Sequence, residues 1–420
     1  MANVEIECGE CTEATIKNFK KINQHIMFRH LFKMIWNKKK QNALLISEML
    51  VSFLVLFAVF SLLVFNYQNY KKPMGFDYEN VWVVNFNNAL TTNSTDSINL
   101  FYETIRKTIK SMPQVKEISF VNDNIPFSVN TVQSGLTHNK KHVDHINWHR
   151  AEDSYAATLN LKILEGRWFD KQDVASANEP VIINNSLKEL VFGKEDAAGK
   201  LMGNEDDKVK WKVVGVIEDI KEKGDYSNPG LAIYHRADTG SIRSLGKILV
   251  SVKPDADASF ESHLYKSLSI AMPNSNVEIE HLADKRKNIN YFALVPMVVL
   301  LIVSGFLIVN VALGLFGVLW YNINKRRGEI GLRRAVGATG KSVSSQLVYE
   351  AMILATFSLI IGCFFAAQFP LLNVFDLSSG VYITAIFLSV IFIYLLVLIC
   401  SLYPGKQAAA IYPAVALHEE

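Results

Sequence analysis

Residues 291–339 decide the fold class of this chain. They read YFALVPMVVLLIVSGFLIVNVALGLFGVLWYNINKRRGEIGLRRAVGAT, which is an apolar run up to Trp320 followed by a basic segment. A helix of about 20 apolar residues crosses the roughly 30 Å hydrocarbon core of a bilayer. Because residues 291–320 exceed that length, they predict a membrane-spanning helix, and the basic residues behind them predict a segment outside the hydrocarbon.

Three more apolar runs of comparable length occur at 43–67, 347–369 and 381–403. Four such runs are rare in soluble proteins, so they predict an α-helical membrane protein with four transmembrane helices rather than a soluble protein with buried helices. The long segment 68–290 is polar enough to form a domain with its own core. The net charge of +3 over 420 residues, without an aromatic and basic platform, argues against nucleic-acid binding.

The distribution of lysine and arginine predicts the side of the membrane on which each segment lies. Basic residues precede the first span, crowd the segment 321–346 and follow the fourth span, whereas the loop 370–380 has none. Since cytoplasmic segments carry the excess of positive charge, we expect both termini, the tail 404–420 and the 321–346 segment in the cytoplasm. The 68–290 domain and the 370–380 loop are then expected on the opposite side.

The N-terminal region precedes the first span and has two parts. Residues 1–26 are polar and lack the apolar core of a signal peptide, and a start at Met27 is kept as an alternative to translation of this extension. Cys8 and Cys11 form a single C-x-x-C pair without a second pair, so a metal or redox role is disfavoured. The apolar spacing within 27–42 predicts an amphipathic helix along the cytoplasmic face of the membrane.

A succession of strand, helix and strand occurs twice within 68–290. The expected elements are 81–86, 97–111 and 115–121 in the first copy, and 248–252, 258–271 and 277–279 in the second. Two such units predict a ferredoxin-like α+β lobe. They flank an insertion of about 122–246 that is richer in strand and turn signals, so a β-rich insertion lobe is expected beside it.

Short motifs follow one another in a definite order within this insertion. They are GRWF at 166–169, PVIIN at 180–184, LVFG at 190–193, GK at 199–200 and VVGVIED at 213–219. Gly166 and Gly215 suit turns or close packing. Arg167 is able to bind an anion, but a local ion pair with Asp170 or Asp173 is favoured.

The motif order and the basic segment 325–339 together resemble the MacB/FtsX-like family of ABC transporter permeases, with its MacB-type periplasmic core domain. The resemblance covers nearly all of the chain from about residue 27. It implies a cytoplasmic ABC ATPase subunit that binds ATP and Mg²⁺, and a second permease subunit that is identical or different. It also implies a bacterial inner membrane location and a further partner such as a periplasmic adaptor or hydrolase. The chain itself is then expected to be no enzyme and to hold no cofactor.

The same resemblance implies that the segment 321–346, here called the coupling segment, receives force from the ATPase. Its predicted coupling residues are Glu329, Ile330, Gly331, Leu332, Arg333, Arg334, Val336 and Gly337. Glu329 stands four residues before Arg333, which favours an ion pair on a helix. The three apolar residues are expected to fill a groove on the partner, the arginines to meet its acidic rim or membrane phosphates, and the glycines to permit close approach. A solvated loop without a partner is the alternative.

Two patterns in the sequence suggest chemistry that we do not expect. Residues 335–342, AVGATGKS, end like a phosphate-binding loop, but Ala335 replaces the first glycine and no buried strand precedes it. His138, His142, His145 and His149 would share one face of a helix and could bind a metal there. Residues 139–144 are more typical of a polar turn, so no metal site is predicted.

Two carboxylates lie within the apolar spans, near the expected cytoplasmic ends. They are Glu48 in the first span and Glu350 in the third. Because ionised groups in lipid are costly, one hypothesis is that they pair with Arg333, Arg334 or nearby lysines and so hold the coupling segment, and it is less favoured for Glu48 than for Glu350. The alternative is that both reach the membrane surface by extending their side chains.

The expected function is that of a permease subunit that transmits ATP hydrolysis by its partner to the extracytoplasmic domain. Export or extraction of a peptide, lipoprotein or antimicrobial compound is the expected process. A non-transport regulator of a cell-wall hydrolase or sensor is one alternative. A membrane receptor without an ATPase is another, and the basic coupling segment argues against it because a receptor needs no segment that bears force.

Overall fold

The computed structural model describes residues 39–86, 94–204, 210–237, 245–273, 275–372 and 374–412. These residues form two compact units. The membrane unit contains the described residues up to Phe65 and from Met297 onward, and the sheet unit contains Asn66–Pro296. Cys8, Cys11 and all but the last four residues of the amphipathic helix expected at 27–42 lie outside the described residues.

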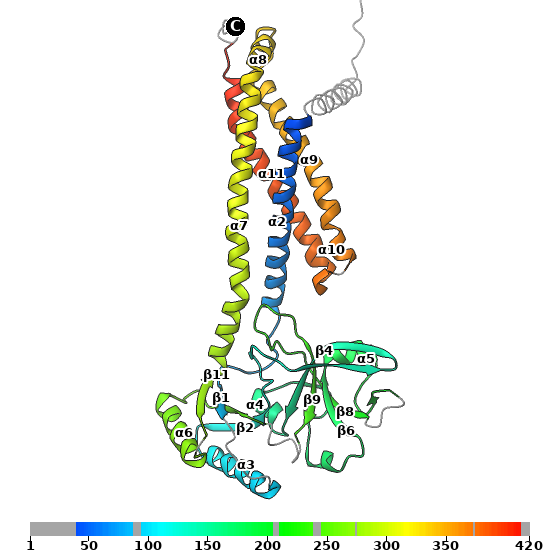
Figure 1. The fold of residues 1–420 in the computed structure, drawn as a ribbon, viewed down its shortest axis with the longest axis vertical. Coiled ribbons are helices and arrows are strands. Elements are labelled where there is room, and N and C mark those ends of the chain that lie inside the picture. The colour runs from blue at the N-terminus through cyan, green and yellow to red at the C-terminus, as the bar shows by residue number, and fades with distance from the viewer. Residues whose placement is uncertain are drawn as a thin grey trace, which may run out of the picture. The chain divides into compact units, whose positions relative to one another are not determined.

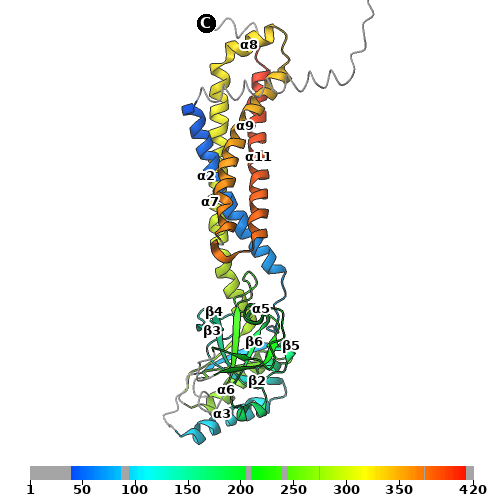
Figure 2. The same cartoon turned by 90° about the vertical axis from the view of Figure 1, so that its right-hand side faces the viewer.

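Among the described residues, four helices are long and apolar enough to cross a membrane, which confirms the predicted number of spans. They are α2 (Lys39–Lys71), α7 (Leu282–Lys325), α9 (Gly340–Ala366) and α11 (Ser379–Ala409). Figures 1 and 2 show them side by side in the membrane unit. Shorter helices connect them, namely α8 (Arg327–Ala335), α10 (Gln368–Leu371) and the 3₁₀ helix η3 (Val374–Asp376).

Small residues allow close packing inside the membrane unit. A Cβ added to Gly362 of α9 would lie 2.4 Å from the ring of Phe53 in α2. Ala355 and Ala385 are fully buried where α9 and α11 pack together. Since lipid gives membrane helices no hydrophobic reason to associate, such close contacts supply the packing energy.

The helices extend beyond the apolar runs from which the spans were predicted. Helix α7 begins at Leu282 rather than at 291, and α9 begins at Gly340 because the hydroxyl of Thr339 accepts a hydrogen bond from the Ser342 N–H (3.2 Å). Helix α11 continues through Pro404 to Ala409, so the expected tail 404–420 is helical at its start. The predicted and observed bounds differ because capping residues set where a helix begins and ends. Hydropathy locates only the part of the helix that is apolar enough to lie in lipid.

The sheet unit contains the predicted ferredoxin-like lobe. Its elements are β1 (Val81–Phe86), α3 (Thr95–Lys110), β2 (Val115–Val121), β10 (Lys247–Val252), α6 (Ala258–Ala271) and β11 (Val277–His281). The strand order β11-β1-β10-β2 is antiparallel throughout, as that fold requires. Buried side chains of α3 and α6, among them Tyr102 and Leu264, pack with those of the strands in one core.

The insertion adds seven strands and two α-helices among the described residues. They are β3 (Gln133–His138), β4 (Lys141–Ala151), α4 (Tyr155–Leu159), β5 (Ile163–Gly166), β6 (Glu179–Asn184), α5 (Asn185–Phe192), β7 (Leu201–Met202), β8 (Trp211–Ile217) and β9 (Leu231–Arg236), with the 3₁₀ helix η1 (Lys171–Ala175). The β-rich character is confirmed.

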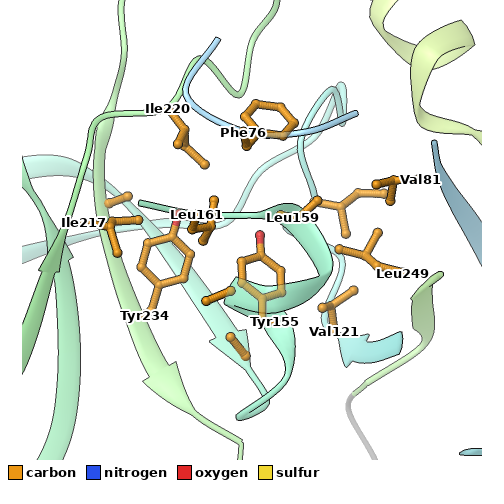
Figure 3. Packing of buried hydrophobic residues seen from close by; sticks show 14 of the residues in the cluster. Phe76, Val81, Val121, Tyr155, Leu159, Leu161, Ile217, Ile220, Tyr234 and Leu249 are labelled. Carbon is orange, nitrogen blue, oxygen red and sulfur yellow. The ribbon is translucent and has the colours of Figure 1, made fainter. Parts of the chain in front are cut away.

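The two expected lobes share a single sheet, which the sequence did not indicate. Its main path runs β11-β1-β10-β2-β4-β9-β6-β8-β5. Strands β2 and β4 join the lobes through one residue pair, Val121 and Ala151. A core that includes Tyr155 and Tyr234 of the insertion and Leu249 of the ferredoxin-like lobe packs beside this junction (Figure 3).

The structure confirms one local prediction in the insertion and limits another. Arg167 forms a two-pronged ion pair with Asp173, at 2.7 and 2.8 Å, and this pairing lowers the pKa of Asp173. The polar turn expected at 139–144 is confirmed at Asn139 and Lys140, which have positive φ as in a hairpin turn, whereas Lys141 already begins β4. The four histidines therefore do not lie on one face of a helix.

Candidate coupling site

Local sequence determines the shape of the coupling segment. After α7 ends, Arg326 leaves helical geometry (φ −107°, ψ 16°), and α8 follows at once. Gly337 ends α8 with φ 103°, a conformation that glycine adopts without a steric penalty, and its N–H donates to the Arg334 carbonyl (3.2 Å). Figure 1 shows α8 between the ends of α7 and α9.

One face of α8 packs against the ends of the membrane helices. Ile330 is 5% exposed and lies in a small core with Ile323 of α7, Val343 of α9 and Ala408 of α11. The expectation that Ile330 fills a groove on a partner is therefore wrong for this structure, because its own chain already buries it. Gly331 is also buried on this face.

Ion pairs hold the start of α8. Arg326 contacts Glu329 at 2.9 Å and Glu350 of α9 at 3.2 Å, and Gln346 donates to Glu350 at 3.1 Å. The hydrogen bond to Glu329 is the main cause of the raised pKa of Arg326. Glu350 thus pairs with Arg326 rather than with the predicted Arg333 or Arg334, because the break after α7 directs Arg326 toward α9.

The two predicted arginines have other partners. Arg333 pairs with Glu329 at 2.6 Å, which confirms the ion pair expected from their spacing, and it donates to Gln346 at 2.9 Å. Arg334 donates to the carbonyl of Ala409, the last residue of α11. A cation at the carboxyl end of a helix is favourable because the helix dipole is negative there, so Arg334 fastens α8 to α11.

The opposite face of α8 is exposed. Leu332 is 56% exposed and Val336 is 82% exposed. A Cβ added at Gly328 or Gly337 would meet no atom within 4 Å. The exposed face therefore combines two apolar side chains with two positions where another surface can approach the backbone.

The phosphate-loop-like residues 335–342 lie at the end of α8 and the start of α9. Helix α8, and not a buried strand, precedes them, so the geometry of a phosphate-binding loop is missing. Within the described residues, no group of three or more His, Cys, Asp or Glu side chains is arranged to hold a metal ion.

Glu48 of α2 lies against α7. A Cβ added at Gly314 would be 2.6 Å from one oxygen of the Glu48 carboxylate. Among the side chains that the structure describes, Glu48 has none of the predicted cationic partners. Its position follows from helix packing, because the glycine leaves room for the carboxylate.

Sequence reasoning missed Arg326 and Gln346 as parts of this site. Arg326 lies within the basic segment 325–339 and three residues before Glu329. Its ion pair with Glu329 could therefore have been predicted from their spacing in the sequence. Its contact with Glu350 joins residues 24 positions apart and depends on how α7 and α9 meet. No local spacing reports such a contact.

The four apolar helices, the ferredoxin-like lobe with its insertion, and the fastened helix α8 define a membrane-embedded permease subunit. The family model of the FtsX-like permease C-terminal domain matches residues 301–413, and that of the MacB-like periplasmic core domain matches residues 44–262, more than half of the chain. The chain belongs to the MacB/FtsX-like family of ABC transporter permeases.

Curated relatives agree with this assignment. The macrolide export ATP-binding/permease protein MacB of Rhodopseudomonas palustris (strain HaA2) is 28% identical over 64% of this chain and 42% of the relative. An uncharacterized ABC transporter permease, YvrN of Bacillus subtilis (strain 168), is 24% identical over 75% of this chain and 78% of the relative. The chain thus spans less than half of the length of the MacB relative.

Two of the solved structures that this chain resembles are of a periplasmic region and an extracellular domain. The periplasmic region of MacB from Actinobacillus actinomycetemcomitans is 16% identical, with a TM-score of 0.36, over 50% of this chain and 92% of that chain. The extracellular domain of the noncanonic ABC-type transporter YknZ from Gram-positive bacteria is 16% identical, with a TM-score of 0.32, over 47% of this chain and 100% of that chain.

Proposed function

We propose that this permease subunit passes the movement of a separate cytoplasmic ABC ATPase to its extracytoplasmic domain. The observation that carries the proposal is α8, which is fixed to α7, α9 and α11 on one face and exposes Leu332 and Val336 on the other. A partner that grips the exposed face would move the ends of three membrane helices together. The ATPase would bind ATP and Mg²⁺, and this chain would bind neither.

The same proposal includes an inner-membrane location with both termini cytoplasmic and a second permease subunit. The charge asymmetry of the loops supports the orientation. Since closed symmetric assemblies are the rule, two permease and two ATPase subunits are the simplest complex.

The cavity in the membrane unit is mostly apolar, which favours mechanical transmission over passage of a solute. This cavity of about 740 Å³ is lined by residues of α2, α7, α9, α10, η3 and α11. Its lining is apolar except for groups such as Ser61, Gln368 and Tyr382. Such a cavity does not provide a path for a hydrophilic solute, so work done on the extracytoplasmic domain is the better account.

The class of process follows only by similarity. Relatives bear the name macrolide export ATP-binding/permease protein, which supports export of an antimicrobial compound; export or extraction of a peptide or a lipoprotein is part of the same proposal. Control of a cell-wall hydrolase or a sensor would use the same coupling helix. A periplasmic adaptor or hydrolase is therefore the expected further partner in either case.

Co-purification tests the proposal. The affinity-tagged full-length chain, isolated from native membranes in mild detergent, should carry an ABC ATPase. Leu332→Asp should abolish this association, because a buried apolar anchor contributes much of the affinity in helix-in-groove docking. Lys341→Ala is the matched control, since it removes an exposed charge from the same segment and should retain the ATPase. Normal ATPase capture by a membrane-inserted Leu332→Asp variant would refute the coupling assignment.

A further inference from the structure

The loop between β8 and β9 contacts both helices that connect the sheet unit to the membrane spans. We call residues 218–230 the clamp loop. The last turns of α2, from Asn66, and the first turns of α7, up to Pro296, belong to the sheet unit. Different residues of the clamp loop contact the end of α2, the start of α7 and the β-rich insertion.

The clamp loop holds the end of α2 through a buried lysine. Lys221 is 1% exposed, and its ammonium group donates to the carbonyls of Asn69 (2.8 Å) and Asp225 (3.1 Å). A cation at the last carbonyls of a helix is favoured by the helix dipole. Asn69 in turn donates to the Tyr226 carbonyl (3.1 Å), and the Tyr226 ring stacks on Tyr70.

The clamp loop holds the start of α7 through Asp225. The Asp225 carboxylate accepts two hydrogen bonds from Arg286 (3.0 and 2.9 Å) and one from the Asn290 side chain (2.7 Å). The Asp225 N–H donates back to the Asn290 side chain (2.9 Å). At Gly224 (φ 92°) a Cβ would lie 2.5 Å from the Asn290 side-chain oxygen, so the loop backbone lies directly on the helix.

The residues beside Asp225 hold the β-rich insertion. The Glu222 carboxylate accepts from Asn147 (2.8 Å) and lies 2.9 Å from His149, and both partners are on β4. The Lys223 ammonium donates to the Ser128 carbonyl (2.9 Å). The clamp loop thus ties α2, α7 and β4 together within a few consecutive residues.

We propose that the clamp loop transmits displacement of α2 and α7 to the β-rich insertion, with Asp225 as the central force-transmitting residue. Among the described strands, one pair, Val121 and Ala151, joins the two lobes within the sheet, so the backbone ladder by itself is a weak mechanical link beside the shared core around Tyr155. Buried, charge-assisted hydrogen bonds keep their partners in a narrow range of positions. Movement of Arg286 or Asn290 therefore moves Asp225, and with it the neighbouring Glu222. This inference rests on the proposed function.

The test compares the permease–ATPase complex, isolated from native membranes and placed in nanodiscs, with and without ATP and vanadate. Hydrogen exchange, read by mass spectrometry, reports on β4 and β9. In the wild type, nucleotide should change their exchange rates. In Asp225→Ala, that nucleotide-dependent difference should fall about ten-fold while the ATPase stays bound.

Asp153→Ala is the matched control. Asp153 also accepts two hydrogen bonds from one arginine, Arg236 (2.8 and 2.7 Å), but its partner is on β9 and not on either helix. The control should keep the full difference. Faster hydrogen exchange of β6 and β8 in Asp225→Ala without nucleotide would mean that the substitution destabilises the fold. The test then uses Asn290→Ala in its place, because that substitution removes two hydrogen bonds and no charge.

The outcomes separate the two proposals. If the folded Asp225→Ala or Asn290→Ala complex keeps the full nucleotide-dependent change in hydrogen exchange, the clamp proposal is wrong. The proposed function is then unaffected. An equal loss in Asp153→Ala also overturns the clamp, because the effect is then not specific to the helix contacts. A wild-type complex whose sheet unit does not respond to nucleotide overturns the proposed function and the clamp with it.

Discussion

Gly166 of β5 and Gly215 of β8 face each other as a strand pair, and neither has room for a side chain. A Cβ at Gly215 would lie 2.2 Å from the Arg167 carbonyl oxygen, and one at Gly166 would lie 2.2 Å from that of Val214. Backbone atoms cannot move aside as a flexible side chain can. The two glycines are therefore required for the pairing of these strands.

Gly215→Ala should lower the free energy of unfolding by about 1–3 kcal/mol, the usual cost of overpacking. Gly246→Ala is the control, because its Cβ would have no atom closer than 3.9 Å and should change stability by about 0.5 kcal/mol or less. Denaturant unfolding of the full-length chain in detergent, followed by tryptophan fluorescence, measures both. Equal stability of the two variants would contradict the steric argument.

His149 makes the stability of the sheet unit depend on pH. Burial by itself would lower the pKa of His149, but the adjacent Glu222 carboxylate and the hydrogen bonds outweigh burial, so the pKa is raised. The other titratable groups that interact with Glu222 are the Lys223 ammonium and the hydroxyls of Tyr155 and Tyr234. Burial raises the pKa of both tyrosines well above the ordinary value, so they stay neutral.

The pKa of a histidine in an unfolded chain is about 6.5. When the pKa in the folded state is higher, the protonated histidine stabilises the fold fully below about pH 6.5. This contribution is lost as the pH rises through the folded-state pKa. The free energy of unfolding should therefore decrease as pH rises above about 6.5. His149→Gln keeps a hydrogen-bonding side chain but cannot titrate, so it should flatten this decrease. An unchanged slope in His149→Gln would assign the pH dependence to other groups.

At the scale of single elements, α8 is a helix with two different faces. Its fastened face uses Ile330, Arg326 and Arg334, and its exposed face offers Leu332 and Val336. Any side chain at Gly337 would strain a backbone with φ 103°, so Leu332→Asp tests the partner surface more cleanly than a substitution of that glycine.

Arg326→Ala should weaken ATPase capture although Arg326 lies on the fastened face. It removes ion pairs to both Glu329 and Glu350, and charged hydrogen bonds of this kind contribute about 1–2 kcal/mol when partly buried, or about ten-fold in affinity. Arg333→Ala should have a smaller effect, because Arg333 is 41% exposed. Quantitative co-purification compares them, and the reverse ranking would contradict this account of α8.

For the molecule as a whole, the distribution of lysine and arginine predicts the orientation in the membrane. In a chain without native cysteines, Val174→Cys, at an exposed site in the sheet unit, should react with a membrane-impermeant maleimide on intact spheroplasts. Ser342→Cys, exposed in the membrane unit, should react only after permeabilisation. Labelling of Ser342→Cys on sealed spheroplasts would invert the proposed topology.

Much of the fold could be predicted because it is encoded over short distances. Hydropathy located all four spans, and short runs rich in β-branched and aromatic residues located β1 and β2 with the bounds that the structure shows. Arg167 and Asp173, six positions apart, were predictable partners for the same reason. The identity of the family also followed from the order of local motifs.

The tertiary structure alone decided which residues work together across longer distances. Asp225 and Arg286 are 61 positions apart, and Arg326 and Glu350 are 24 apart, so no periodic pattern links them. The burial of Ile330 depends on three helices that converge on it, whereas its sequence neighbours only mark it as apolar. Periodicity records which face of an element avoids water, but the partner of that face is set by how the chain folds back on itself.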